Sequence, residues 1–163
     1  MFQIFPGNNK GFIFLEIIIA VALISIVFIT LLGVGFSSLN VSSSLQQQSQ
    51  ANALAQEEIE AVRAFRDSTA STWDTTGIGS YNTATDYHLV LSGNPPAWSI
   101  TADSEVVGQF TRKIVFNNVS RNANGDIVES GGTYDPDTRK ITVTVIFGSK
   151  THQLATYLTN WQN

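Results

Sequence analysis

The residue with the clearest capacity for chemistry is an acid, Glu16, which stands inside the most apolar stretch of the chain. Residues 12–36 contain no other charged side chain, and no Lys or Arg occurs between Lys10 and Arg63. A carboxylate at the centre of a membrane helix costs about 2.5–3.5 kcal/mol on insertion scales, and less near its end. Glu16 therefore needs a partner that its own segment does not supply, or it extends its carboxylate to the lipid headgroups.

The apolar segment that holds Glu16 predicts a membrane span. As a helix, its 25 residues would be about 37 Å long, which exceeds the roughly 30 Å hydrocarbon core of a bilayer. A soluble domain as small as this one has too little surface to cover a helix that is apolar on all sides. A secretory signal peptide has a shorter apolar region, of about 7–15 residues, followed by a small-residue cleavage site that this sequence lacks.

The residues before and around Glu16 also form a recognisable pattern. Lys10, Gly11 and Phe12 lead into the apolar segment, and Glu16 is the fifth residue counting from Phe12. This pattern resembles the class III signal of bacterial type IV pilins and type II secretion pseudopilins. Residues 51–67 further resemble the acidic, apolar helix end of minor pilins of the V type and I-type pseudopilins. Ile13 stands where the family often has Thr. The resemblance is specific over residues 10–36 and looser beyond them.

The resemblance implies a processing pathway and a set of partners. Residues 1–11 would be a leader peptide, which a prepilin peptidase/methyltransferase removes after Gly11 before it methylates the new amine of Phe12. Glu16 would then attract the N-terminal amine of a neighbouring pilin or pseudopilin subunit in a filament. The family also implies contact with an inner-membrane assembly platform and with membrane lipid.

The energetics of this ion pair are consistent with a role in setting the axial register between neighbouring helices of the filament. A free α-amine has a pKa of about 7.7–8.0 in water and is cationic at neutral pH. In a bundle of apolar helices an unpaired charge is very costly, so each amine would be held level with a carboxylate.

The distribution of positive charge predicts the orientation of the span. Lys10 and the amino terminus precede the apolar segment, and no cation follows it until Arg63. The positive-inside rule then places the N-terminus in the cytoplasm and the C-terminal part outside. We expect a single-pass protein of the inner membrane that later enters a periplasmic or extracellular filament. Removal of the leader with Lys10 changes the net charge from −4 to −5.

Residues 37–67 predict a polar, amphipathic extension of the same helix. Residues 40–50 are polar nearly all round, which fits a flexible linker or a helix that finds partners only in an assembly. Gly33, Gly35 and the serines that follow make residues 33–44 the expected weak point of the helix.

Residues 51–67 form a better helix with one apolar face. That face comprises Ala51, Leu54, Ala55, Val62 and Phe65, with Ile59 at its edge. Glu58 projects into the middle of this face. It is either a partly exposed carboxylate at the rim or the partner of a cation on the covering sheet, for which the candidates are Arg112, Lys113 and Lys140.

The remainder of the chain, residues 68–163, predicts a small antiparallel β-sheet domain. Residues 68–87 form a long connecting loop in this interpretation, and alternating apolar runs then predict strands. The expected strands cover residues 87–91, 98–101, 109–119, 140–147 and 151–161. A turn at Gly148 makes the last two a hairpin. The predicted fold class is α+β and pilin-like, with the C-terminal half of the long helix packed on the sheet.

Other classes of function find little support in the sequence. Residues 122–139 form a predicted polar loop whose carboxylates Asp126, Asp135 and Asp137 are calcium candidates, although Asp135 and Asp137 also fit a simple turn. We expect no cofactor and no enzymatic activity, because catalytic motifs are missing from the sequence. The net charge of −4 and the lack of a basic patch argue against a nucleic-acid partner.

The sequence therefore predicts a structural pilin-like subunit, either a minor pilin or a pseudopilin, of a type IV pilus or a type II secretion filament. The alternative is a monomeric, single-span membrane-anchored domain that binds a partner outside the cell and never polymerises.

Overall fold

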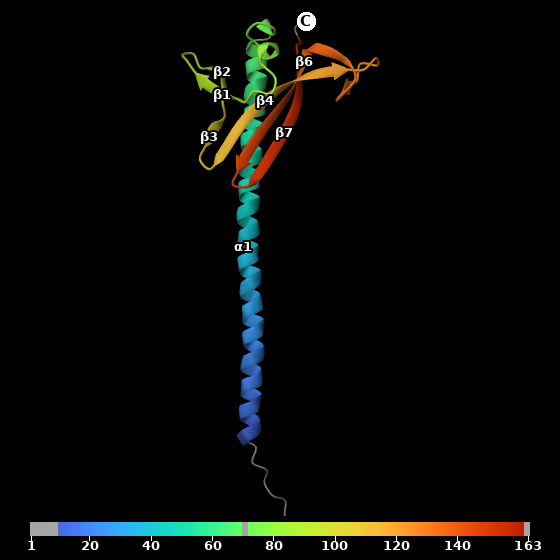
Figure 1. The fold of residues 1–163 in the computed structure, drawn as a ribbon. Helices are drawn as coiled ribbons and strands as arrows, with labels where there is room; N and C mark the ends of the chain where they lie inside the picture. The colour runs from blue at the N-terminus through green and yellow to red at the C-terminus, as the bar shows by residue number, and fades with distance from the viewer. Residues whose placement is uncertain (1–9, 70–71, 162–163) are drawn as a thin grey trace, which may run out of the picture. The chain divides into compact units, whose positions relative to one another are not determined.

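The computed structural model describes residues 10–69 and 72–161. The chain has an α+β fold, in which a long N-terminal helix precedes an antiparallel sheet (Figure 1). It divides into two compact units, Met1–Leu45 and Gln46–Asn163. Helix α1, Lys10–Ser68, contributes its first part to one unit and its last part to the other. The predicted leader, apart from Lys10 and Gly11, lies outside the described residues.

The first unit is the apolar part of α1. The helix is continuous through residues 33–44, so the predicted weak point is helical in the isolated chain. Two polar side chains in the apolar segment are satisfied within the helix. Ser25 Oγ donates to Val21 O at 2.7 Å, and Thr30 Oγ1 donates to Val27 O at 2.8 Å. Neither hydroxyl therefore demands water or a partner, which suits an apolar environment.

The second unit is a seven-stranded antiparallel sheet with the C-terminal part of α1. The strands are β1 Tyr87–Ser92, β2 Ala97–Ala102, β3 Glu105–Val107, β4 Phe110–Arg121, β5 Ile127–Val128, β6 Thr133–Phe147 and β7 Lys150–Thr159. Their order is β2-β1-β4-β6-β7, while β3 and β5 each pair with β4. Figure 1 shows β4, β6 and β7 alongside the C-terminal part of α1.

The core lies between the helix and one face of the sheet. Ala51, Ala55 and Val62 are fully buried, as the helical period predicts. They pack in one cluster with alternate residues of the central strands, among which Ile114, Phe116, Ile141, Val143 and Val145 are also fully buried. Small alanines on the helix let the backbone approach the larger strand side chains closely, which favours dense packing.

The predicted polar loop over residues 122–139 is wrong in two places, because it contains the two-residue strand β5 and the beginning of β6. Strand β6 already begins at Thr133, so the stretch predicted as a turn, residues 135–138, belongs to a strand. The register against β4 shifts between Asn118 and Val119, which face Arg139 and Asp135 respectively. Pro136 lies within this irregularity and has no partner on β4, so its missing N–H breaks no hydrogen bond of that ladder.

The predicted connecting loop over residues 68–87 is also more ordered than its composition suggests. It contains the short 3₁₀ helix η2, Ile78–Ser80, and two core side chains, Trp73 and Ile78. The Trp73 Nε1–H donates to Pro136 O at 3.0 Å and fastens this segment to β6. The sequence interpretation also missed the three-residue strand β3.

Candidate assembly site

The first unit presents an apolar helix surface that no described residue covers. Every residue from Phe12 to Leu39 is exposed. Exposure of the large apolar side chains runs from 47% at Leu32 to 79% at Phe12. This helix is long and apolar enough to cross a membrane. A surface of this kind and size is stable only in lipid or against other protein, because monomeric soluble proteins rarely expose contiguous apolar patches larger than a few hundred Å².

Glu16 lies in the middle of one face of this apolar helix. Its neighbours on that face are Phe12, Leu15, Ile19, Ala20 and Leu23, at the i, i+3, i+4 spacing of a helix. No ion pair or hydrogen bond engages the Glu16 carboxylate within the described part of the chain. The small side chain of Ala20, one turn away, leaves a shallow hollow beside the carboxylate. The geometry thus offers an acceptor, with space beside it, in an otherwise apolar face.

The predicted cleavage point is at the beginning of α1. The helix begins at Lys10, so Gly11 and Phe12 belong to its first turn. Both residues therefore lie at the N-terminal limit of the described helix.

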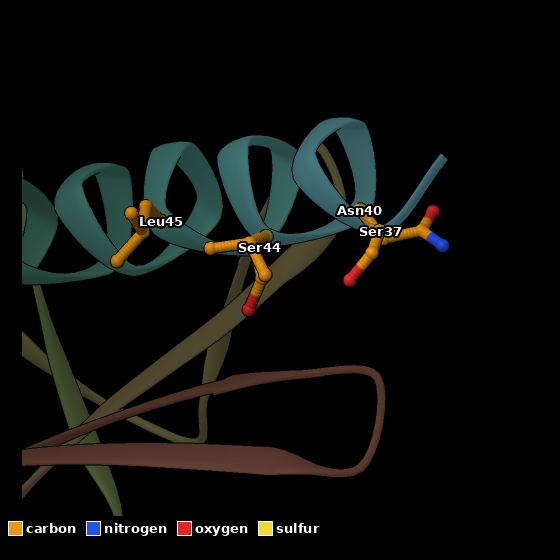
Figure 2. A pocket seen from close by; sticks show the side chains of 5 residues that line it. Ser37, Asn40, Ser44 and Leu45 are labelled. Carbon is orange, nitrogen blue, oxygen red and sulfur yellow. The ribbon is translucent and has the colours of Figure 1, made fainter. Parts of the chain in front are cut away.

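A polar face follows the apolar segment near the end of the first unit. Ser37, Asn40, Ser44 and Leu45 line a shallow hollow along the helix, and Figure 2 shows their side chains on the same side of α1. Ser37, Asn40 and Ser44 are small or polar, whereas Val41 and Leu45, which also line the hollow, are apolar; all five recur at helical spacing.

The second unit contains a buried carboxylate, Glu58, in the middle of the helix face that packs on the sheet. Its exposure is 1%, and its Oε1 accepts a hydrogen bond from the Leu89 N–H at 2.9 Å. The Arg112 Nε lies 3.2 Å from Oε2. The prediction that Glu58 pairs with a sheet cation is confirmed, and the cation is Arg112. Lys113 instead pairs with Asp86 at 2.8 Å, and Lys140 lines a hollow with Asn117 and Tyr157, its neighbours on the adjacent strands.

Arg112 is the centre of a cluster that ties three elements together. Its Nε also donates to Glu105 of β3 at 2.6 Å, and its Nη1 lies 3.5 Å from Glu57 of α1. Arg112 is itself 7% exposed. Burial lowers the pKa of its guanidinium, but the carboxylates around it, Glu58 foremost, outweigh that effect and raise the pKa. Arg112 is therefore a permanent cation held inside the unit.

The carboxyl of Glu58 responds mainly to its burial. Burial raises the pKa of Glu58 above its ordinary value of 4.5, while the Leu89 N–H and the Arg112 guanidinium act to lower it. Desolvation disfavours the charged form of an acid, and an adjacent cation favours it. The ion pair between Glu58 and Arg112 thus joins the helix to the sheet. The attraction of Arg112 only partly offsets the free-energy cost of burying the Glu58 charge.

The calcium candidates are engaged elsewhere and do not converge. Asp135 Oδ2 accepts from Arg121 Nε at 2.6 Å, and Asp126 Oδ2 accepts from the Asn122 amide at 3.2 Å. The Asp137 N–H donates to Asp135 Oδ1 at 3.0 Å. In the described ranges, 10–69 and 72–161, no group of three or more His, Cys, Asp or Glu side chains could hold a metal ion.

One further polar anchor was missed by the sequence interpretation. Arg139 is 7% exposed and donates to the Asn118 side chain and to Gly79 O, which joins β6 to β4 and to η2. No local pattern marks this residue, because its partners lie 21 and 60 positions away. A basic residue in an alternating strand, at a position whose side chain faces the core, is the only signal that could have revealed it.

Comparison of the chain with protein-family models, with curated proteins and with solved structures finds no match.

Proposed function

We propose that this chain is a pilin-like structural subunit, either a minor pilin or a pseudopilin. It is made with a leader that ends at Gly11, anchored in the bacterial inner membrane with its sheet unit outside, cleaved, methylated on Phe12 and assembled into a filament. The observation that carries the proposal is the exposed apolar part of α1, residues 12–36, with one uncompensated carboxylate, Glu16, in the middle of a face. The signal-like residues Lys10, Gly11 and Phe12 supply the processing step by resemblance.

In the proposed filament, residues 12–36 of neighbouring copies pack together as a central bundle. The amine of Phe12 in one copy pairs with Glu16 of the next. These two residues are four positions apart, so pairing offsets neighbouring helices by about 6 Å along their axes at about 1.5 Å per residue. Loss of one partner leaves the other charge unpaired in an apolar bundle, at a cost of about 3–5 kcal/mol for each subunit.

The first test is the intact mass of the protein purified from membranes of cells that contain a prepilin peptidase, with fragmentation of the N-terminus. A chain that begins at N-methyl-Phe12 is expected. A chain that still begins at Met1 would contradict the processing step and would favour the alternative, a monomeric membrane-anchored domain that does not polymerise.

The second test asks whether assembly depends on the position of the Glu16 carboxylate or only on the presence of a carboxylate in the membrane helix. Glu16→Ala should still be cleaved, but its recovery in a sheared filament fraction should fall by a factor of at least about 100, which is what 3 kcal/mol represents. The matched control exchanges two neighbours, Leu15→Glu with Glu16→Leu. This double variant keeps composition and hydropathy constant and turns the carboxylate by about 100° around the helix. Normal assembly of the exchanged variant would contradict a register role for Glu16.

A further inference from the structure

Both ends of the sheet in the second unit are open strand edges. The order β2-β1-β4-β6-β7 leaves β2 and β7 with one partner each. No backbone hydrogen bond among the described residues reaches the outer side of either strand. Strand β2 contains no Asp, Glu, Lys, Arg or Pro, and the only such residue of β7 is Lys150 at its first position. Natural sheets usually protect such edges with charges, prolines or bulges, because an open edge pairs readily with another strand.

Strand β7 is the longer and more accessible of the two edges. It pairs with β6 without a register shift, from Phe147↔Lys150 to Thr138↔Thr159. Phe147 and Lys150 close this two-residue hairpin, and the two residues of a closing pair are joined by two backbone hydrogen bonds. Along an antiparallel ladder, hydrogen-bonded pairs of this kind alternate with pairs that form no hydrogen bond to each other. This alternation directs five sets of backbone N–H and C=O groups away from β6. They belong to residues whose side chains are all exposed: Thr151, Gln153, Ala155, Tyr157 and Thr159.

A groove beside β7 provides room for another strand. Ile59, Glu60 and Arg63 of α1 line it together with Leu154 and Ala155 of β7. Glu60 and Arg63 pair with each other at 2.5 Å, so the helix side of the groove carries no net charge from them. An uncharged strand can therefore lie along β7 without meeting an unpaired charge from Glu60 or Arg63.

We propose that the occupant of the β7 edge is strand β2 of a second copy of this chain. Neighbours along the order β2-β1-β4-β6-β7 are antiparallel, so β2 and β7 run in the same direction. Two copies in the same orientation thus bring β7 of one beside β2 of the next as a parallel pair. Each copy has one edge of each kind, so the contact is heterologous and repeats from copy to copy. This orientation rests on the proposed function, because the subunits of one filament share one direction.

The same geometry places particular side chains next to one another. Trp98 and Ile100 of β2 pack against the core, so Ser99 and Thr101 face the opposite side of the sheet. Gln153 and Ala155 of β7 face that same side. In a continuous sheet these four side chains share one face. Ser99 or Thr101 of one copy comes within disulfide range of Gln153 or Ala155 of the next in the registers that place them opposite one another.

Disulfide crosslinking tests this pairing in the full-length chain, which contains no natural cysteine. The variants combine Ser99→Cys or Thr101→Cys with Gln153→Cys or Ala155→Cys. The four combinations cover three registers of a parallel pair, because Ser99 opposite Gln153 and Thr101 opposite Ala155 are the same register. Mild oxidation in membranes or filaments should give a ladder of multimers in at least one combination, with at least a tenfold higher yield than either single variant. The matched control combines Ser99→Cys with Thr142→Cys. Thr142 faces Ala155 one strand further in, about 4.8 Å away from the edge, so the control should not crosslink.

The outcomes separate this inference from the proposed function. Filaments with no ladder in any combination would overturn the edge pairing and leave the filament proposal standing. Dimers from Ala155→Cys alone would indicate a symmetric β7–β7 contact and would overturn the β2–β7 assignment. A ladder from a chain that keeps Met1 and forms no filament would support the edge pairing and overturn the function. The absence of ladder, processing and filament together would overturn both.

Discussion

Replacement of Arg112 by Met would test the electrostatic account of the second unit. The variant leaves Glu58, 1% exposed, without its cation, whereas the Leu89 N–H still donates to the carboxylate. Breaking a buried pair from one side typically costs about 3–5 kcal/mol. Glu58 has an alternative to staying charged, however, because it can take up a proton in the folded state. Protonation of Glu58 therefore limits the loss of folding stability in Arg112→Met and makes that loss depend on pH.

The limit follows from the ordinary pKa of the carboxyl, 4.5. Protonation at pH 7 costs 2.5 pH units, or about 3.4 kcal/mol at 1.36 kcal/mol per unit. At pH 5 the same step costs about 0.7 kcal/mol. A carboxyl whose folded pKa is raised destabilises the fold above its unfolded pKa, and this effect grows until the pH passes the folded pKa. Arg112→Met should therefore lose up to about 3 kcal/mol at pH 7 and much less at pH 5. The second partner, Glu105, is one-third exposed and contributes little to the difference.

The assay is chemical denaturation of the full chain in detergent micelles, followed by tryptophan fluorescence, to which Trp73, 3% exposed, contributes together with Trp98 and Trp161. The control, Lys113→Met, breaks an ion pair whose partners are 29% and 43% exposed, so it should cost less than about 1 kcal/mol at either pH. The double variant Glu58→Gln with Arg112→Met should lose the pH dependence. Equal losses for Arg112→Met at pH 5 and pH 7 would refute the reasoning, since Glu58 would then not be the group that bears the penalty.

Other predictions concern the core and the β6 irregularity. Phe116→Ala removes a fully buried ring that lies 5.5 Å from Tyr81 and 5.6 Å from Tyr87, and it should cost about 3–5 kcal/mol in the same denaturation assay. Asp135→Asn should cost about 1 kcal/mol at pH 7, because its partner Arg121 is partly exposed. Burial acts to raise the pKa of Asp135, but the hydrogen bonds that it accepts, first from Arg121, hold its pKa below 3.8. Its contribution is thus present above pH 3.8 and is lost as the pH falls through the folded pKa, so the wild type and Asp135→Asn should converge in stability in acid.

The helix and its buried face could be predicted because both depend on a local period. Ala51, Ala55 and Val62 recur at helical spacing, and a repeat of this kind can be seen within a short window. The α+β class followed in the same way from alternating runs such as Ile141, Val143 and Val145. In both cases the information lies in residues that are close in the sequence and face the same side.

The features that escaped prediction depend on contacts between distant residues. Trp73 fastens residues 72–80 to β6 through Pro136, 63 positions away. Nothing in the Ser-, Thr- and Gly-rich composition around it indicates that contact. Similarly, Asp135 and Pro136 read as a turn, and only the pairing of β6 with β4 across the irregularity makes them part of a strand. The choice of Arg112 over Lys113 depended on strand facing, since successive side chains point to opposite faces of a sheet.

Helix α1 carries two carboxylates on apolar faces, Glu16 and Glu58. The structure shows the partners of Glu58, and the proposed function supplies a partner for Glu16. At both positions, burying the carboxylate as an unpaired charge would cost free energy. For Glu58 the chain supplies the answer, a backbone N–H and the guanidinium of Arg112. For Glu16 the described chain supplies neither, and its face of the helix is uncovered. Glu58→Gln should therefore alter the stability of the second unit and leave processing unchanged. Glu16→Gln should leave that stability unchanged and reduce assembly. If Glu16→Gln assembled normally, the carboxylate would need no cation from outside the chain, and its place in the apolar face would then be explained by lipid headgroups alone.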